Sequence, residues 1–274
     1  ILGDLAPGGQ IYAKRDENRL VASGASMNKP ILALVQLLKY RGEPEKQLNK
    51  KELDGLLSYT RSPGFESNHV NRLISGRDPI DKRLKRRKKT IGMITNNDAA
   101  AFLKKLGLDP KMKIRFGDFG NNEQTAKQFF DFMRLIHDED KLESLGIGEE
   151  ASIIVNYMKR NMPGVKMGRD RESRRWGPLV TELNRSGISV DSLYGKGGLI
   201  NQGLHYSFVI NDRYLLSMYS DQGGAFGKNY RAPFENKMKK ILKDSNIFQS
   251  SIAESKILNQ IFGLIEETQN NELV

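Results

Sequence analysis

The sequence of 274 residues contains no cysteine at all. That absence excludes disulfide bonds, a thiolate nucleophile and cysteine-based zinc sites. It is compatible with a bacterial protein that works outside the cytoplasm and avoids mispaired thiols. Histidine is scarce too: His69, His137 and His205 are far apart and lack the spacing of metal ligands. We therefore predict no metal and no other cofactor, and we interpret His137, at the end of an amphipathic pattern, as structural.

Long apolar runs are also missing. No stretch reaches the length of roughly 20 apolar residues that a membrane-spanning helix needs, so we expect no membrane span. The chain begins at Ile1 and shows no signal-peptide pattern. We interpret it as a processed or trimmed chain from which the export signal is absent, and we expect an extracytoplasmic location, periplasmic or secreted.

Acidic residues are outnumbered by basic ones. The chain has 44 Lys and Arg against 33 Asp and Glu, a formal net charge of +11. Much of the excess lies in residues 81–89 and 169–175, and a basic surface favours nucleic acid, a membrane surface or a cell-wall polymer. Neither run is accompanied by a zinc-finger or RNA-binding signature. We therefore interpret both runs as solvated surface, expect no nucleic-acid partner, and expect the charge to suit an anionic cell wall.

What the chain does have is a clear order of strand and helix patterns. A Pro-Gly turn separates two early strand-like segments, and Asn211-Asp212 is a hairpin signal between two late ones. Amphipathic and apolar helical patterns occupy most of the sequence between the early and the late strand segments, and two more follow the last strand. The predicted strands are residues 1–5, 10–14, 192–196, 204–210 and 213–219, and the predicted helices are 26–40, 51–60, 69–74, 97–106, 125–137, 149–160, 179–184, 232–242 and 252–267.

This order predicts a mixed α/β (α+β) fold. A hairpin is too small to be stable alone, so we expect the early one to join the late strands in one antiparallel sheet. Helices would flank that sheet, and an all-α region would be inserted between its two parts. The predicted domains are residues 1–40 with 185–274 for the sheet domain, and residues 41–184 for the inserted helical domain.

Ser26 and Lys29 form the only Ser-x-x-Lys of the sequence. Pro30 is tolerated only in the first turn of a helix, so the helix over the apolar run 31–38 must begin close to Ser26. Residues three apart share a helix face, so the Lys29 amine can reach the Ser26 hydroxyl. It can take the hydroxyl proton if burial or a nearby cation lowers its pKa. The alternative interpretation is a helix-capping Ser26 beside a solvated Lys29.

A second stretch whose residues could bind a substrate is Lys196-Gly197-Gly198-Leu199, on a late strand. Glycine weakens a strand, so two glycines indicate that something approaches the backbone closely. A substrate lying there would meet Lys196, which can bind a carboxylate, and backbone N–H groups near Gly198 and Leu199, which can bind an oxyanion. The alternative interpretation is a β-bulge with an exposed lysine.

A third stretch, Glu66-Ser67-Asn68, lies at a predicted junction between a loop and a helix. Ser and Asn are favoured at helix N-termini, where they bond the first backbone N–H groups, so a structural role is one interpretation. The other is a polar pair that completes a catalytic cleft.

In chain order, these three stretches resemble the three motifs of the penicillin-recognising serine enzymes, the class A β-lactamases and the D,D-peptidases. The family's motifs are Ser-x-x-Lys, Ser-x-Asn and Lys-Thr-Gly. The resemblance covers nearly the whole chain and implies a β-lactamase/transpeptidase-like fold. It also implies that Ser26 is the acylated nucleophile, Lys29 its base and Lys196 the ligand of the substrate carboxylate. The N–H groups of Ser26 and Leu199 would form the oxyanion hole, and Asn68 would contact the substrate amide.

The sequence departs from the family at places that bear on chemistry. Glu66 falls on the family's second-motif serine if Asn68 is matched, and Gly197 replaces a threonine that would bind substrate. Class A enzymes carry a water-activating glutamate in the loop before the predicted helix at 125–137, whereas residues 107–122 contain no Glu and Glu123 lies at the loop's edge. We therefore expect an acyl-enzyme that hydrolyses slowly.

One further departure concerns the ends of the chain. The family's N-terminal helix, which packs on the sheet, has no counterpart here. We hypothesise that the predicted helix at 252–267 occupies its place.

The prediction is a serine acyl-transfer hydrolase that acts, as a monomer, on β-lactams or D-Ala-D-Ala-type peptidoglycan stem peptides through an acyl-Ser26 intermediate. The alternative is a non-catalytic β-lactamase-like protein that binds a cell-wall peptide. The candidate catalytic residues are Ser26, Lys29, Ser67, Asn68 and Lys196, and the candidate substrate-binding residues are Glu66, Gly197, Gly198 and Leu199.

Overall fold

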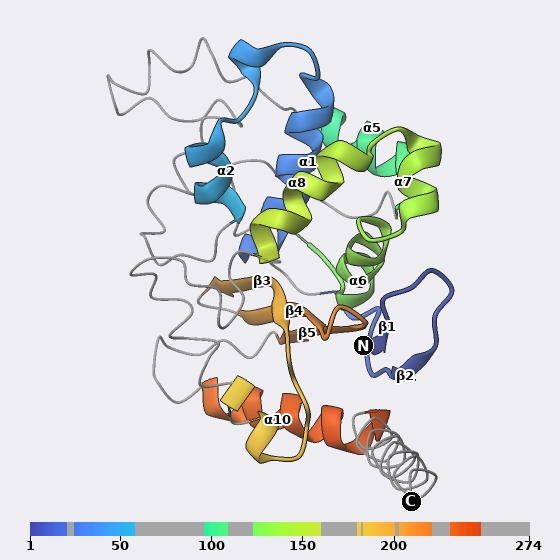
Figure 1. The fold of residues 1–274 in the computed structure, drawn as a ribbon, viewed down its shortest axis with the longest axis vertical. Coiled ribbons are helices and arrows are strands. Elements are labelled where there is room, and N and C mark those ends of the chain that lie inside the picture. The colour runs from blue at the N-terminus through green and yellow to red at the C-terminus, as the bar shows by residue number, and fades with distance from the viewer. Residues whose placement is uncertain are drawn as a thin grey trace, which may run out of the picture.

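The structure is a computed structural model that describes residues 1–20, 25–57, 96–108, 123–159, 180–181, 183–200, 203–220 and 231–247. Figure 1 shows most helices gathered on one side of a central sheet and α10 crossing the other side. The strands are β1 (Leu2–Asp4), β2 (Ile11–Ala13), β3 (Leu193–Ile200), β4 (Gly203–Ile210) and β5 (Tyr214–Ser220). The helices are α1 (Lys29–Lys39), α2 (Lys50–Leu57), α5 (Asn96–Lys105), α6 (Ala126–Leu135), α7 (Glu139–Leu145), α8 (Gly148–Lys159) and α10 (Arg231–Asp244), with 3-10 turns η1 (Ala25–Asn28) and η2 (Pro44–Lys46).

The five strands form one antiparallel sheet in the order β2-β1-β5-β4-β3. The prediction that the early hairpin joins the late strands is confirmed, because β1 pairs with β5 and Leu2 lies opposite Leu216. The chain reverses between β4 and β5 at Asn211 and Asp212, whose φ angles are 53° and 52°. Asn and Asp tolerate this left-handed region better than other L residues do, which is why they signal the turn in the sequence. The mixed helix-and-strand architecture with an antiparallel sheet agrees with the predicted α+β class.

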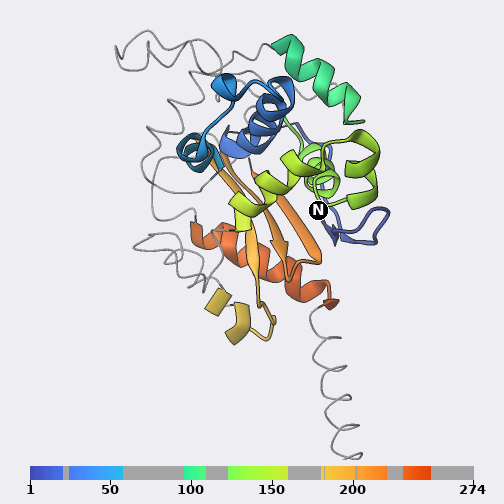
Figure 2. The same cartoon turned by 45° about the horizontal axis from the view of Figure 1, so that its top comes forward.

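The two faces of the sheet are covered by different helices, as Figure 2 shows from a second direction. Val209 and Leu215 belong to the larger hydrophobic core, which they share with residues of α1, α6 and α8. Their neighbours Phe208 and Leu216 point to the opposite face and share a second core with Leu242 of α10. Alternate residues of a strand point to opposite faces, so the same strands supply both cores.

The helices α1 and α6 match their predictions closely. In α1, every residue from Lys29 to Leu37 is buried, which explains the nearly unbroken apolar run. Thr125 caps α6 by a reciprocal pair of hydrogen bonds: its hydroxyl accepts from the Gln128 N–H at 3.1 Å, and the Gln128 side chain accepts from the Thr125 N–H at 2.9 Å. This cap fixes the start of α6 at Ala126, two residues after Gln124, which lies beside the candidate site.

Helix α7 was not predicted. Its sequence is polar, and among its residues only Leu142 is buried, so it lacks an amphipathic period. Local signals define it instead: the Asp138 side chain accepts from the Lys141 N–H, and Gly146 ends the helix with φ 63°.

Several predicted features lie outside the described residues. They are the second motif Glu66-Ser67-Asn68, the helices predicted at 69–74 and 252–267, the two basic runs, and the loop at 109–122. The domain boundaries stay a prediction. Within the described ranges, none of the helices combines the length and the apolar character needed to cross a bilayer.

Candidate functional site

Ser26 lies in η1, the 3-10 turn that leads directly into α1. The prediction placed Ser26 at the start of the helix itself, whereas α1 begins at Lys29 with Pro30 in its first turn. Pro30 has no N–H and cannot bond the Ser26 carbonyl as an α-helix would require, so the turn before it takes the tighter 3-10 geometry. Residues three apart are eclipsed in a 3-10 turn, so the predicted pairing of Ser26 with Lys29 on one side of the chain is kept.

Lys29 is only 5% exposed. The alternative of a solvated Lys29 is therefore wrong. Burial lowers the pKa of the Lys29 amine well below its ordinary value, because water no longer stabilises the charged form, and the positive charge of Lys196 lowers it further. An amine with a lowered pKa is neutral over more of the pH range, and a neutral amine can accept a proton.

Lys196 reaches this site from β3. The turn η1 packs against β3 and β4, so the strand carrying Lys196 lies next to Ser26 and Lys29. Lys196 is 3% exposed, and its amine donates a hydrogen bond to the Gly197 carbonyl at 3.1 Å. The pairing of β3 with β4 runs without a shift along the whole of β3. The alternative of a bulged strand with an exposed lysine is therefore wrong.

Gly195 explains how β3 fits so closely at this point. Its φ is 155°, and a Cβ placed there would come within 2.0 Å of the Ser207 carbonyl oxygen. Any other residue would push β3 away from β4 at the position just before Lys196. Gly195 thus sets the distance between the two strands beside the candidate site.

Other polar side chains share the sheet face of Lys196. Ser207 lies opposite Lys196 on β4, and its hydroxyl oxygen is 2.6 Å from that of Ser217 on β5. One row further, the rings of His205 and Tyr219 lie with their centroids 4.6 Å apart. The sequence analysis did not assign these residues to a site. The available signal was the period-two alternation of His205 and Ser207 with apolar neighbours on β4.

A chain of hydrogen bonds ties η1 to the sheet. The Tyr219 hydroxyl donates to the Gln124 side-chain oxygen at 2.7 Å, and the Gln124 amide donates to the Asn28 side-chain oxygen. Asn28 and Gln124 are fully buried. The Asn28 amide nitrogen has no acceptor within the part of the chain that the structure describes. The three side chains come from β5, from the residue before the α6 cap and from η1, so this network holds the Ser26 turn in place.

The remaining candidate residues are placed only in part. Glu66, Ser67 and Asn68 lie outside the described residues. Gly198 and Leu199 follow Lys196 on β3, where Gly198 pairs with His205. The oxyanion-hole role of the Leu199 N–H stays a prediction.

His137, just after α6, contacts both α6 and β3. Its ring nitrogens lie 2.7 Å from the Met133 carbonyl oxygen and 3.0 Å from the Tyr194 hydroxyl. These contacts fit the predicted structural role. Among the residues that the structure describes, no three His, Asp or Glu side chains are grouped so that they could hold a metal ion.

No protein-family model matches this chain, and no curated protein matches it. The case for function therefore depends on the residues and their geometry.

Proposed function

We propose that this protein is a serine acyl-transfer hydrolase of the β-lactamase-like kind, with Ser26 as nucleophile and Lys29 as its base. The observation that carries the proposal is the burial of Lys29 beside Lys196, next to the turn that bears Ser26. Two buried amines close together do not both keep their charge readily. With Lys196 charged, Lys29 is driven toward the neutral form that a serine nucleophile needs as a partner.

The reaction would proceed in two halves. The Lys29 amine takes the proton of the Ser26 hydroxyl as the oxygen attacks the substrate's amide carbonyl carbon, giving a tetrahedral intermediate. The carbon–nitrogen bond then breaks, the leaving nitrogen receives the proton from Lys29, and an ester on Ser26 remains. Water hydrolyses that ester and restores the hydroxyl. Donors aimed at the oxyanion, for which we propose the N–H groups of Ser26 and Leu199, each contribute about 3 kcal/mol in enzymes of this kind.

The substrates that we propose are β-lactams or D-Ala-D-Ala-type peptidoglycan peptides. Both pair an amide-type carbonyl with a nearby carboxylate, which Lys196 would bind. Gly197 supplies no hydroxyl to share in that contact, and no glutamate occurs in residues 107–122 to activate water. Slow hydrolysis of the acyl-enzyme is the expected consequence.

Labelling with a fluorescent penicillin tests the proposal. Wild-type protein should gain one acyl group by intact mass, and Ser26→Ala should gain none. Ser144→Ala is a matched control, because Ser144 lies on α7 and its hydroxyl donates to the Lys141 carbonyl of the same helix. Equal labelling of wild type and Ser26→Ala, or no labelling of wild type, contradicts the mechanism.

The alternative of a non-catalytic binding protein is favoured by one observation. Lys196 is almost fully buried and donates to the carbonyl of its own neighbour, so its amine is engaged within the protein. A protein of this second kind would bind peptidoglycan fragments with equal affinity in wild type and Ser26→Ala, and would form no adduct.

A further inference from the structure

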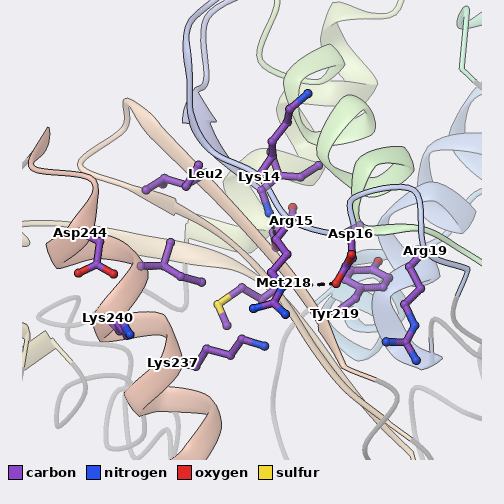
Figure 3. Close-up of a pocket in the computed structure, with 15 residues that line it drawn as sticks. Leu2, Lys14, Arg15, Asp16, Arg19, Met218, Tyr219, Lys237, Lys240 and Asp244 are labelled. Atoms are coloured by element: carbon purple, nitrogen blue, oxygen red, sulfur yellow. Dashed lines mark hydrogen bonds and ion pairs between the residues drawn. The ribbon is translucent and has the colours of Figure 1, made fainter.

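A cavity of about 500 Å³ lies apart from the Ser26 site. It opens between the segment after β2, the strands β1 and β5, and α10, as Figure 3 shows. Leu2, Met218 and Ile241 give it an apolar floor. Neither Ser26, Lys29 nor Lys196 lines it.

Two cations converge over that floor. In Figure 3 the Arg15 guanidinium and the Lys237 amine point toward one another beside Met218. Within the described residues, Lys237 forms no ion pair, and Arg15 pairs only with the adjacent Asp16, at 3.6 Å. Like charges that face each other repel, so an anion between them would relieve the repulsion and gain attraction from both.

The carboxylates around the cavity limit where an anion would sit. Asp16 lies beside Arg15 and toward Tyr219, and Asp244 lies at the far end of α10. Both would repel an anion near them, whereas the space between Arg15 and Lys237 is flanked by positive charge. Lys240 adds a third cation on the α10 side.

We propose that this cavity binds an anionic amphiphile, with its head group between Arg15 and Lys237 and its apolar body over Leu2, Met218 and Ile241. The head group is a phosphate or a carboxylate, since both match the charge of the two cations. The volume lies within the range of about 300–1,000 Å³ that is typical of small-molecule sites. The proposal does not depend on acyl transfer at Ser26, because Ser26, Lys29 and Lys196 do not line the cavity, although Ser217 and Tyr219 border both sites.

Isothermal titration calorimetry with simple amphiphiles tests the proposal. Octyl phosphate and octanoate, kept below their micelle concentrations, should bind wild-type protein, and the tighter of the two identifies the head group. Inorganic phosphate and butyl phosphate should bind less tightly, because they cover less of the apolar floor. Raising the salt concentration should weaken binding, because the two cations are exposed to solvent.

A charge reversal at Lys237 gives the sharpest comparison. Lys237→Glu should weaken octyl phosphate binding by about tenfold or more, and the neutral Lys237→Gln by less. Lys104→Glu is the matched control, since Lys104 is exposed on α5, which Figure 1 shows on the far side of the sheet from α10. Thermal unfolding of each variant checks that the fold is intact.

The proposal is overturned if wild type and Lys237→Glu bind octyl phosphate equally, or if octyl phosphate binds no more tightly than inorganic phosphate. Penicillin labelling of Ser26 in Lys237→Glu should equal that of wild type. The two proposals can therefore fail separately.

Discussion

The strands β3, β4 and β5 bury two faces of opposite character. On the face toward α10, the buried side chains are those of Leu193, Tyr206, Phe208, Ile210, Tyr214, Leu216 and Met218. On the face toward α1, α6 and α8, the same strands bury Lys196, His205, Ser207 and Ser217 beside Tyr194, Val209 and Leu215. Most of the described side chains on both faces are buried, but a charged side chain is buried on only one of them, and the polar groups among the side chains named for the other face are the hydroxyls of Tyr206 and Tyr214.

The difference between the two faces shows which of them supplies packing energy and which supplies the reactive groups. Burying a polar group costs free energy unless its hydrogen bonds are made, and burying a charge costs more. The side chains named for the α10 face include no charged group, so that face avoids the larger cost and supplies packing. The polar face carries the cost of buried polar and charged groups next to Ser26, where a lysine with a lowered pKa can act as a base.

Of the substitutions considered, Lys29→Met on the polar face should have the largest effect on acylation. Loss of the proposed base should slow acylation of Ser26 by about 10²–10⁴-fold. The free energy of unfolding should stay the same or rise, because a buried amine is replaced by an apolar side chain of similar length. Rates of labelling by a fluorescent penicillin, with urea unfolding alongside, measure both effects. An unchanged labelling rate would show that Lys29 is not the base.

Leu216→Ala, on the α10 face, should lower stability and leave acylation of Ser26 unchanged. Leu216 is fully enclosed between β1 and β4, opposite Leu2 and Phe208. Its truncation leaves a cavity and should lower the free energy of unfolding by about 3 kcal/mol in urea titrations. The labelling rate per folded molecule should not change. A loss of labelling with little loss of stability would contradict the division between the two faces.

Tyr219→Phe tests whether the buried hydrogen bonds hold the Ser26 turn. The variant leaves the Gln124 oxygen without its donor and should cost about 1–2 kcal/mol of unfolding free energy. Hydrogen exchange in η1 should become faster, and acylation slower.

The matched control for that variant is Tyr12→Phe. The Tyr12 hydroxyl donates to Asp4 at 3.0 Å, and the Asp4 side chain is 18% exposed whereas Gln124 is fully buried, so the loss of this bond should cost less. Equal effects of the two substitutions on η1 would rule out a specific role for the buried network.

The buried Lys29 amine of the polar face should also make the free energy of unfolding depend on pH, which is a smaller effect. In the unfolded chain Lys29 stays protonated up to about pH 10.5, whereas in the folded protein its pKa is much lower. Between the two values the unfolded chain binds more protons, so the free energy of unfolding should rise with pH, by at most about 1.4 kcal/mol per pH unit. The same stability is lost as the pH falls through the folded-state pKa.

Urea unfolding of wild type and Lys29→Met across this range isolates the effect. The advantage of Lys29→Met over wild type should shrink as the pH approaches 10.5. Parallel curves for the two proteins would mean that the Lys29 pKa is not lowered.

Much of the fold could be predicted because its signals are local. The alternation in β4 and β5, the Asn211-Asp212 turn and the position of Pro30 each specify an element within a few residues. That the early hairpin joins the late strands could be predicted, but not that β1 pairs with β5, because the pairing of Leu2 with Leu216 joins distant parts of the chain. Helix α7 was missed because its caps, and not an apolar period, define it.

In the candidate site, too, the residues of local motifs could be predicted and the contacts between distant elements could not. Ser26, Lys29 and Lys196 could be singled out by residue type and spacing. The hydrogen bonds from Tyr219 through Gln124 to Asn28 could not, since each partner lies on a different element and none belongs to a motif.

By itself, the sequence determined which segments become strands and helices, and that Ser26 and Lys29 lie on one side of a turn that Pro30 delimits. Those outcomes follow from backbone geometry over a few residues. Only the tertiary structure decided that Lys196 lies buried next to Lys29, and therefore that the Lys29 amine has a lowered pKa. Desolvation and charge repulsion depend on every group packed around an atom, and the packing of β3 against η1 exists only in the folded chain.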